Sequence, residues 1–284
     1  MKYFILGAGG MAGHMIAVYL SERGYTVTGL DRRPSPVCET VVCDVTDLRA
    51  LDDAVASQAP DVIVNCIGVL NQFAEQDKEA AVFLNAFLPH HLAKITADTP
   101  CRVVHLSTDC VFSGKNPPYA CGDLRDGETF YDRSKALGEL EDDKNLTVRG
   151  SIVGPDLNPN GIGLLNWFMR QSGEINGFVR AIWTGQTTLQ LAKTIEAAVT
   201  DGAAGLYNTV PDGPISKYEL LGLFNRELRD GAVTIRPQDT FVCDKTLIAS
   251  DAPFCRAIPG YVQMVRELAE WMRAHRALYP HYFG

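Results

Sequence analysis

The sequence predicts a doubly wound α/β fold, in which a parallel sheet carries helices on both faces, followed by a smaller C-terminal α/β lobe. Three observations predict this fold. Over residues 1–150, short apolar runs alternate with longer helical patterns, as strands and crossover helices do in such a sheet. The apolar runs lack polar alternation, which is typical of strands buried on both faces. A glycine-rich stretch, residues 7–13, directly follows the first run.

Each element follows from its local pattern. Apolar runs predict strands at 3–6, 25–30, 41–43, 61–67, 102–106 and 146–149. Helical patterns predict helices at 11–23, 47–57, 75–97 and 131–140. Residues 154–161 are a loop by composition, and further helices are expected at 164–171, 188–200, 217–229 and 262–279. We therefore expect one domain over 1–150 and a second lobe over 151–284, with a segment near 186–200 returning to the first domain.

The composition is that of a globular protein, and we expect it in the cytoplasm. Of 284 residues 46% are apolar, and 26 Lys and Arg stand against 34 Asp and Glu, a net charge of −8. This acidity argues against a nucleic-acid or membrane partner. No apolar run reaches the roughly 18–20 residues of a membrane span, and no signal peptide is predicted. The eight cysteines show no zinc-type spacing, so we expect reduced thiols and no metal site.

Residues 7–13 predict a turn that binds a dinucleotide. Gly7, Gly10 and Gly13 have the spacing G-x-x-G-x-x-G between the first strand and the first helix. Glycines there permit a tight turn, close approach of a pyrophosphate and close packing of helix on strand. The helix that begins at Met11 then offers free N–H groups and its positive dipole end to the anion. We expect a Rossmann domain that binds NAD or NADP.

The choice between NAD and NADP stays open from the residues. Asp31 ends the second strand, where a carboxylate binds the ribose hydroxyls of NAD. Arg32 follows at once, and a guanidinium there favours the 2′-phosphate of NADP. Asp44 follows the third strand and is placed to accept a hydrogen bond from the adenine amino group. Asp47 is expected to be the N-cap of the next helix.

A tyrosine and a lysine at helical spacing are the candidate proton-transfer pair. Tyr131 and Lys135 form Y-x-x-x-K, which puts both side chains on one helix face. An ammonium beside a phenol stabilises the phenolate, so we expect the pKa of Tyr131 to be lowered toward neutrality. Thr108 stands at the carboxyl end of the preceding strand, where its hydroxyl is placed to bind the substrate oxygen. The glycine turn, the strand-end Thr108 and the Y-x-x-x-K pair follow one another in this order along the chain, and together they are more specific than each is alone.

With these motifs the chain resembles the extended short-chain dehydrogenase/reductase family. Within it, residues 107–114 (STDCVFSG) and 131–139 (YDRSKALGE) resemble the dTDP-4-dehydrorhamnose reductase branch. The resemblance implies catalytic roles for Thr108, Tyr131 and Lys135. It implies that Lys135 also binds the nicotinamide ribose and that Asn85 supports the proton relay. It further implies that the cofactor is lined by Gly10, Met11, Asp44, Val45, Cys66, Ile67 and Gly68.

The resemblance also implies an activity. It is the reduction of a nucleotide-linked 4-keto-6-deoxy sugar, dTDP-4-dehydrorhamnose or a close analogue, for surface polysaccharide precursors. The nicotinamide supplies hydride, and Tyr131 protonates the developing alkoxide. Asp109, Cys110 and Trp183 are expected to contact the substrate. The predicted helices 11–23 and 75–97 are the two candidate surfaces for a homodimer.

Two positions depart from the branch, and two alternative functions stay open. Asp132 stands where the branch usually has glycine, and Ile152 replaces an aromatic residue that packs on the nucleotide base, so nucleotide and sugar stay open. Cys110 stands where epimerase-reductases carry an acid/base cysteine, although residues 150–180 contain no histidine. The alternatives are an epimerase-reductase that uses Cys110 and a non-catalytic NAD(P)-binding regulatory subunit.

Other polar residues carry weaker signals. His14 follows the glycine turn and is a weak candidate for cofactor contact, and Arg180 is one for the diphosphate. His90 and His91 are interpreted as a solvated pair within a helix. His105 has no partner that the sequence reveals.

Overall fold

A computed structural model of the protein describes residues 1–283. They form two compact units, each described by itself. Unit 1 comprises Met1–Ser113, Leu124–Arg149 and Ile195–Tyr207, and unit 2 comprises Gly114–Asp123, Gly150–Thr194 and the chain from Asn208 onward.

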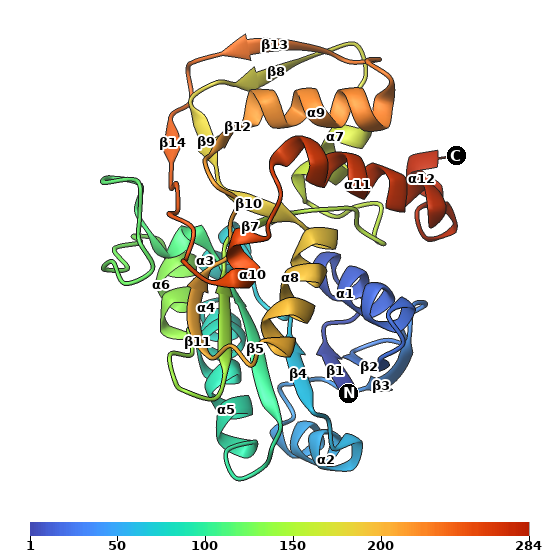
Figure 1. The fold of residues 1–284 in the computed structure, drawn as a ribbon, viewed down its shortest axis with the longest axis vertical. Helices are drawn as coiled ribbons and strands as arrows, with labels where there is room; N and C mark the ends of the chain where they lie inside the picture. The colour runs from blue at the N-terminus through green and yellow to red at the C-terminus, as the bar shows by residue number, and fades with distance from the viewer. Residues whose placement is uncertain (284) are drawn as a thin grey trace. The chain divides into compact units, whose positions relative to one another are not determined.

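Unit 1 is built around a seven-stranded sheet with the order β11-β6-β5-β4-β1-β2-β3 (Figure 1). In that order the strands are β11 (Gly205–Asn208), β6 (Leu146–Arg149), β5 (Arg102–Ser107), β4 (Val62–Asn65), β1 (Lys2–Leu6), β2 (Thr26–Asp31) and β3 (Glu39–Val42). From β3 to β6 every neighbouring pair is parallel. The strand order 3-2-1-4-5-6 is that of a Rossmann fold. The predicted fold class is therefore confirmed.

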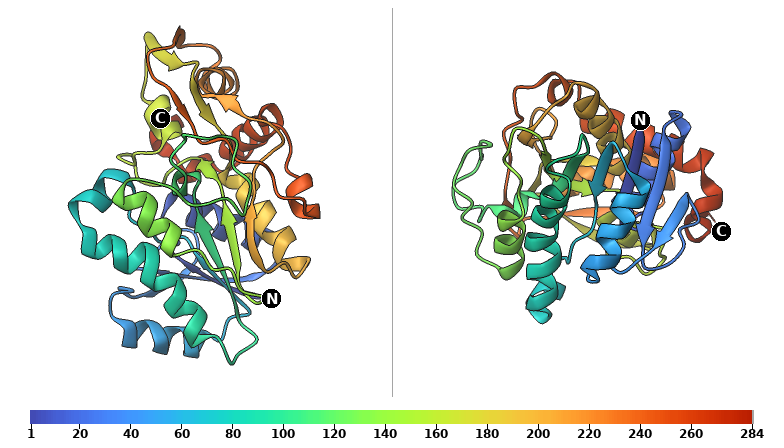
Figure 2. Two further views of the ribbon diagram at one scale, coloured as in Figure 1. Left: turned by 90° about the vertical axis from the view of Figure 1, so that its left-hand side faces the viewer. Right: turned by 90° about the horizontal axis from the view of Figure 1, so that it is seen from below.

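Helices cover both faces of this sheet. On one face, Leu51 and Leu92 pack into a core with Phe4 and Ile63 of the strands. Figure 2 shows α6 on that same face and α1 on the opposite one. The helical segments are α1 (Met11–Glu22), α2 (Leu48–Gln58), α3 (Asn71–Gln76), α4 (Lys78–Ala81), the π-helix η1 (Val82–Phe87), α5 (Leu88–Ile95), the 3-10 turn η2 (Asp109–Val111) and α6 (Phe130–Leu137).

The prediction of a single helix over residues 75–97 is wrong, because the structure divides this range into several helical segments. At Asp77 the backbone leaves the helical region, with φ −129° and ψ 85°, because its carboxylate instead caps the next segment through Ala80 N–H. From Val82 to Phe87 the helix widens into the π-turn η1, which carries Asn85. Such turns occur often at functional sites. The interruption therefore falls at a predicted site residue.

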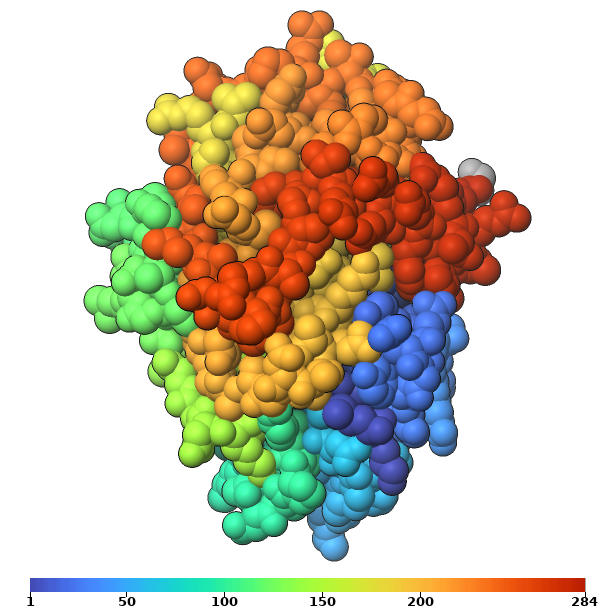
Figure 3. Space-filling model, in the orientation of Figure 1, coloured from blue at the N-terminus to red at the C-terminus, as the bar shows by residue number. Residues whose placement is uncertain are grey.

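Unit 2 combines short strand pairs with helices. β7 (Ser151–Val153) pairs with β10 (Gly185–Thr187), β8 (Glu174–Phe178) with β13 (Thr234–Gln238), and β9 (Ala181–Trp183) lies between β12 (Ile215–Ser216) and β14 (Cys243–Asp244). Its helices are α7 (Leu164–Met169), α8 (Thr188–Thr200, which ends in unit 1), α9 (Lys217–Arg229), α10 (Pro253–Arg256), α11 (Tyr261–Ala274), η3 (Arg276–Leu278) and α12 (Pro280–Phe283). Helix α11 packs on α9 through a buried side that includes Leu268, while its outer side faces the viewer in Figure 3.

Candidate active site

The glycine turn is shaped by the space around its backbone. Gly7 has a φ of +80°, which favours glycine, and its N–H donates to Leu30 O at 2.8 Å. A Cβ at Gly13 would lie 2.1 Å from Gly7 O, so only glycine lets α1 come this close to the turn. No side chain caps α1, which begins at Met11. Its first turn therefore presents backbone N–H groups suited to a phosphate.

Asp31 is tied to the glycine turn from the neighbouring strand. Its Oδ2 accepts a hydrogen bond from Gly9 N–H at 2.9 Å, and its Oδ1 accepts one from Arg32 N–H at 2.7 Å. The Arg32 side chain is exposed at the same edge. The carboxylate and the guanidinium that favour different cofactors thus stand side by side. These residues fit a dinucleotide cofactor, but they do not distinguish NAD from NADP.

The end of β3 adds two carboxylates with different roles. Asp44 Oδ1 accepts from both the N–H and the hydroxyl of Thr46, and the backbone hydrogen bond in particular lowers the pKa of Asp44. Asp44 is exposed, whereas the side chain of Val45 is buried. Asp47 caps α2 by accepting from Ala50 N–H at 3.1 Å, so its predicted role is confirmed.

The end of β4 lies beside the glycine turn. Cys66 N–H donates to Leu6 O at 3.0 Å, and a Cβ at Gly7 would lie 3.1 Å from the side chain of Ile67. A Cβ at Gly68 would lie 3.1 Å from Asn85 Oδ1. The structure therefore brings the cofactor residues expected from three separate segments to one edge of the sheet.

Thr108 and Tyr131 meet at the carboxyl end of β5. Thr108 Oγ1 accepts from Cys110 N–H at 3.1 Å and lies 3.0 Å from Asp109 Oδ1. Tyr131, in the first turn of α6, forms a side-chain hydrogen bond with Thr108. The hydroxyls of Thr108 and Tyr131 therefore lie next to each other. Cys110 packs against the small hydrophobic cluster that contains Tyr131.

The expected lowering of the Tyr131 pKa is wrong. Burial raises the pKa of the phenol, the charges of Cys110 and Asp109 act in the same direction, and only the Thr108 hydrogen bond opposes them. Lys135 points its amine at β5: its Nζ donates to Leu106 O at 2.7 Å and lies 3.2 Å from His105 Nε2. Burial lowers the pKa of Lys135 to about 8.

Asn85 connects helix α6, which carries the candidate residues Tyr131 and Lys135, to the segment after β4. Its Oδ1 accepts from Val69 N–H at 2.8 Å, and its Nδ2 donates to Val69 O at 2.9 Å and to Ser134 Oγ at 3.0 Å. Ser134 lies between the two candidate catalytic residues of α6, Tyr131 and Lys135. A Cβ at Gly138 would lie 1.9 Å from Asn85 O, so α6 and η1 pack in backbone contact. Asn85 therefore fixes α6, and its role in a proton relay stays a prediction.

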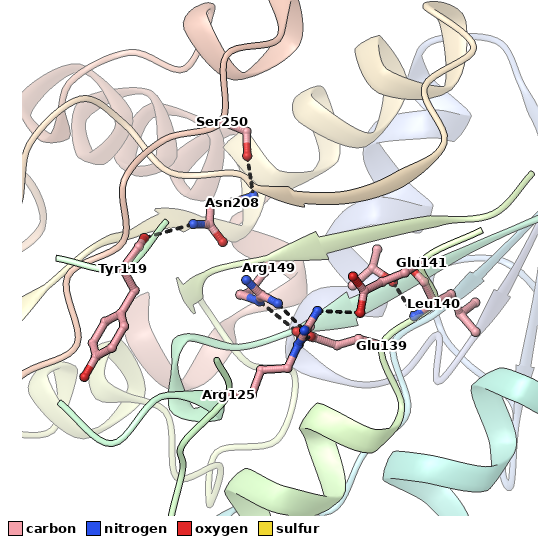
Figure 4. A network of polar contacts seen from close by, with 10 residues as sticks. Tyr119, Arg125, Glu139, Leu140, Glu141, Arg149, Asn208 and Ser250 are labelled. Atoms are coloured by element: carbon pink, nitrogen blue, oxygen red, sulfur yellow. Dashed lines mark hydrogen bonds and ion pairs between the residues drawn. The ribbon is translucent and has the colours of Figure 1, made fainter. Parts of the chain in front are cut away.

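A buried ion network anchors the end of α6 (Figure 4). Glu139 accepts two hydrogen bonds from Arg149, at 2.7 and 2.6 Å, and others from Ser107 and Arg125. Neither Glu139 nor Arg149 has an exposed side chain. Burial disfavours the Glu139 charge, but the hydrogen bond and charge of Arg149 hold its pKa below the usual value. Since Ser107 precedes Thr108, this network also fixes the strand end that carries the Thr108 hydroxyl.

Asp132, the departure from the branch, has a local structural role. Its carboxylate accepts from Thr129 N–H and its own N–H donates to Thr129 Oγ1, which is a capping box at the start of α6. The side chain is buried against the turn at Gly127. Asp132 thus stabilises the helix that presents Tyr131.

Several predicted residues lie elsewhere or have other partners. Trp183 belongs to unit 2, where it packs against Tyr261 with ring centroids 5.7 Å apart, and its contact with substrate stays a prediction. In unit 2, Ile152 lies on β7 and Arg180 is exposed. His14 is fully buried with Nδ1 2.8 Å from Gly10 O.

The interpretation of His90 and His91 as a solvated pair holds for His90, which is exposed, but not for His91, whose side chain is only 12% exposed. His91 Nε2 lies 2.7 Å from Asp52 Oδ1 on α2, and His90 Nε2 lies 2.8 Å from Leu137 O at the end of α6. The two rings therefore connect α5 with its neighbours. Among the described residues, no group of His, Cys, Asp or Glu is placed to hold a metal ion, and no helix is long and apolar enough to cross a membrane.

The sequence analysis missed the partners of Lys135. His105 is completely buried and also lies 3.2 Å from Asn65 Nδ2. Asn65 and His105 are register partners on the parallel strands β4 and β5, so their side chains emerge on one face. The signal was two polar residues at the ends of consecutive apolar runs, which a parallel register would have paired.

The fold and the site together define an extended short-chain dehydrogenase/reductase: a Rossmann sheet with a glycine turn, a strand-end threonine and a Y-x-x-x-K helix. The model of the RmlD substrate binding domain family matches residues 1–240, so the chain belongs to this family. The resemblance inferred from the motifs is confirmed.

Named relatives agree with this assignment. Over 248 residues, 83% of this chain and 82% of the relative, the chain is 29% identical to a dTDP-4-keto-6-deoxy-D-glucose reductase of Streptomyces niveus. It is 35% identical to a dTDP-4-dehydrorhamnose reductase of Mycolicibacterium smegmatis over 141 residues, 49% of this chain and 40% of that protein. The chain also resembles the crystal structure of a dTDP-4-dehydrorhamnose reductase from Clostridium acetobutylicum, with a TM-score of 0.79 at 20% identity. The match covers 96% of this chain and 100% of that chain. That likeness concerns the fold.

Proposed function

We propose that the protein is an NAD(P)H-dependent reductase of a nucleotide-linked 4-keto-6-deoxy sugar, dTDP-4-dehydrorhamnose or a close analogue, and that it serves the synthesis of polysaccharide precursors. The observation that carries the proposal is the convergence of the Thr108 and Tyr131 hydroxyls at the same sheet edge as the glycine turn. The names of the two relatives above supply the substrate class.

The cofactor would lie along this edge. The first turn of α1 would hold its diphosphate, and Asp31 or Arg32 its adenosine ribose, depending on whether NAD or NADP binds. The close approach of Gly13 to Gly7 O supports such a ligand, because it holds the N-terminus of α1 beside the end of β1, as in a dinucleotide-binding turn. When bound, such a cofactor would supply the hydride for the reduction.

The residues of the chain handle the oxygen of the substrate. As negative charge develops on the keto oxygen, Thr108 donates a hydrogen bond to it and Tyr131 transfers its phenolic proton, which gives a secondary alcohol. Burial holds Tyr131 in its protonated form beforehand, which suits a proton donor in a reduction. Asn85 and Glu139 keep α6 in place, so the two hydroxyls are oriented before the substrate arrives.

The test is oxidation of NADPH, and separately of NADH, by the purified protein with dTDP-4-dehydrorhamnose, followed at the nicotinamide absorbance. We expect turnover with at least one cofactor, and Tyr131→Phe to lower kcat by about 10²–10⁴-fold. Cofactor binding by Tyr131→Phe, measured by fluorescence, should persist. Tight cofactor binding without turnover would contradict the proposed substrate.

The alternative function, an epimerase-reductase, is supported by one contact: Cys110 packs against the cluster that contains Tyr131. Cys110→Ser distinguishes the two: a reductase keeps its rate of cofactor oxidation, whereas an epimerase-reductase loses exchange of the substrate's C–H hydrogen with solvent deuterium. A regulatory subunit would instead tolerate Tyr131→Phe without any change in its function.

For cellular context, the proposal places the protein in the cytoplasm, with a nucleotide sugar as partner and neither nucleic acid nor membrane. A homodimer would use the segment around η1, because Phe73, Val82 and Phe87 are exposed there, whereas α1 buries most of its apolar residues. Light scattering on Phe87→Glu against the parent chain tests this surface: a dimer that persists in the variant would contradict it.

A further inference from the structure

The catalytic lysine has a fixed polar partner beneath it. His105 on β5 lies between Asn65 of β4 and Lys135 of α6, with 3.2 Å from its Nδ1 to Asn65 Nδ2 and 3.2 Å from its Nε2 to Lys135 Nζ. All three side chains are buried. None of the steps proposed above uses the imidazole, although it contacts a catalytic residue directly.

A backbone N–H group determines which atoms of Asn65 and His105 donate in these hydrogen bonds. Ile67 N–H lies 3.2 Å from Asn65 Oδ1, and a backbone N–H can only donate, so Oδ1 accepts. The amide nitrogen of Asn65 then faces His105 and donates to Nδ1. A neutral imidazole with an accepting Nδ1 carries its proton on Nε2. That N–H points at Lys135.

An ammonium and an imidazole N–H are both donors and oppose each other. A neutral lysine amine, by contrast, accepts from His105 Nε2–H with its lone pair. One of its own N–H groups then donates to Leu106 O, at a distance of 2.7 Å. We propose that Asn65 and His105 are positioning residues for Lys135: Asn65 holds the imidazole in its Nε2–H form, and this N–H disfavours the ammonium form of the lysine and fixes the direction of its amine.

The surrounding groups agree with this arrangement. Burial is the main cause that lowers the pKa of Lys135 to about 8, with Glu139 and Cys66 acting in the opposite direction. Cys66 is a weak opponent, because burial raises its own thiol pKa to about 12. Burial also holds the pKa of His105 well below 6.5, with Lys135 and His90 adding to this effect, so the ring stays neutral.

The inference rests on the proposed function only in taking Lys135 as catalytic, and its first tests need no substrate. In ¹⁵N-histidine-labelled protein, the His105 ring, assigned by its loss in His105→Gln, should show a protonated Nε2 and no titration between pH 5 and pH 9. A His105 ring protonated at Nδ1, or one that titrates in this range, overturns the inference.

The sharpest variant is Asn65→Asp. A carboxylate accepts from both Ile67 N–H and His105 Nδ1–H, which reverses the tautomer and turns Nε2 into an acceptor for the ammonium. We expect the titration midpoint of Lys135, followed by its ¹³Cε resonance and assigned with Lys135→Met, to rise by about one to two pH units. An unchanged midpoint in folded Asn65→Asp overturns the inference. His91→Gln, in a ring that does not face Lys135, is the matched control and should leave the midpoint unchanged.

Activity gives a third readout. The pH at which kcat/KM declines on the alkaline side should move upward in Asn65→Asp together with the Lys135 midpoint. Absence of any reductase activity in the parent protein would count against the proposed function alone, because the two resonance measurements are made without substrate.

Discussion

The glycine turn and the base of helix α6 lie at the same edge of one sheet, but different contacts build them. The turn consists of backbone hydrogen bonds and of space that a Cβ would fill, mostly among residues 7–13, with Leu30, Asp31 and Ile67 among its distant partners. The base of α6 consists of buried side chains from β4, η1, β5, the segment just after α6, and β6, namely Asn65, Asn85, His105, Glu139 and Arg149.

This difference separates what each region contributes. A change in the turn mainly alters the fit of a ligand, because few other contacts depend on it. A change at the base of α6 leaves a buried charge or polar group without its partner, which costs stability as well as activity. The predictions below test that separation.

The largest effect is expected at the ion network. Arg149→Met removes the main partner of Glu139 where neither side chain is exposed. We expect the free energy of unfolding to fall by about 3–5 kcal/mol, because a buried carboxylate loses its compensation. Chemical denaturation measures this loss. Arg236→Met, at an exposed ion pair with Glu174, is the control and should leave the unfolding midpoint unchanged.

The same network predicts how stability depends on pH. The folded-state pKa of Glu139 lies below its ordinary value of 4.5. The stabilisation from its charge is therefore present above that value and is lost as the pH falls below it. Denaturation curves from pH 7 down to pH 3 should show this loss in the parent chain. If Arg149→Met showed the same slope, Glu139 would not be its source.

A smaller effect on stability but a larger one on the ligand is expected in the turn. Gly13→Ala places a Cβ 2.1 Å from Gly7 O, so α1 must move away from the turn. We expect cofactor affinity to fall by about 10–100-fold, which corresponds to about 1–3 kcal/mol of misfit. Titration of NADPH fluorescence measures it. Gly222→Ala within α9, where a Cβ meets nothing within 4 Å, should bind cofactor normally and gain up to about 1 kcal/mol of stability.

The smallest effect is expected at Asp132, a local feature inside the second region. Asp132→Ala removes half of the capping box of α6 and should cost about 0.5–1 kcal/mol. The nucleotide preference should not change, because the side chain packs against Thr129 and the turn at Gly127. Glu219→Ala, in the same kind of box on α9, should cost a similar amount. An altered preference among nucleotides in Asp132→Ala would show that the residue does more than cap the helix.

The sequence by itself determined the features that depend on residues close together along the chain. Apolar runs located the strands, the glycine spacing located the turn, and Asp47 was recognisable as a helix cap, because each depends on neighbours within a few positions. The order of Thr108, Tyr131 and Lys135 along the chain marked them as candidates, and their roles stay predictions; the structure places a hydrogen bond between the first two.

Only the tertiary structure decided the electrostatics of those residues. The spacing of Tyr131 and Lys135 suggested a lowered phenol pKa, yet burial raises it, and Lys135 turns its amine to β5. The interruption of the predicted helix 75–97 and the pairing of His105 with Asn65 were equally absent from the local pattern. They depend on strand register, on burial and on which side chain is nearest across the sheet, and these quantities arise only when distant segments pack together.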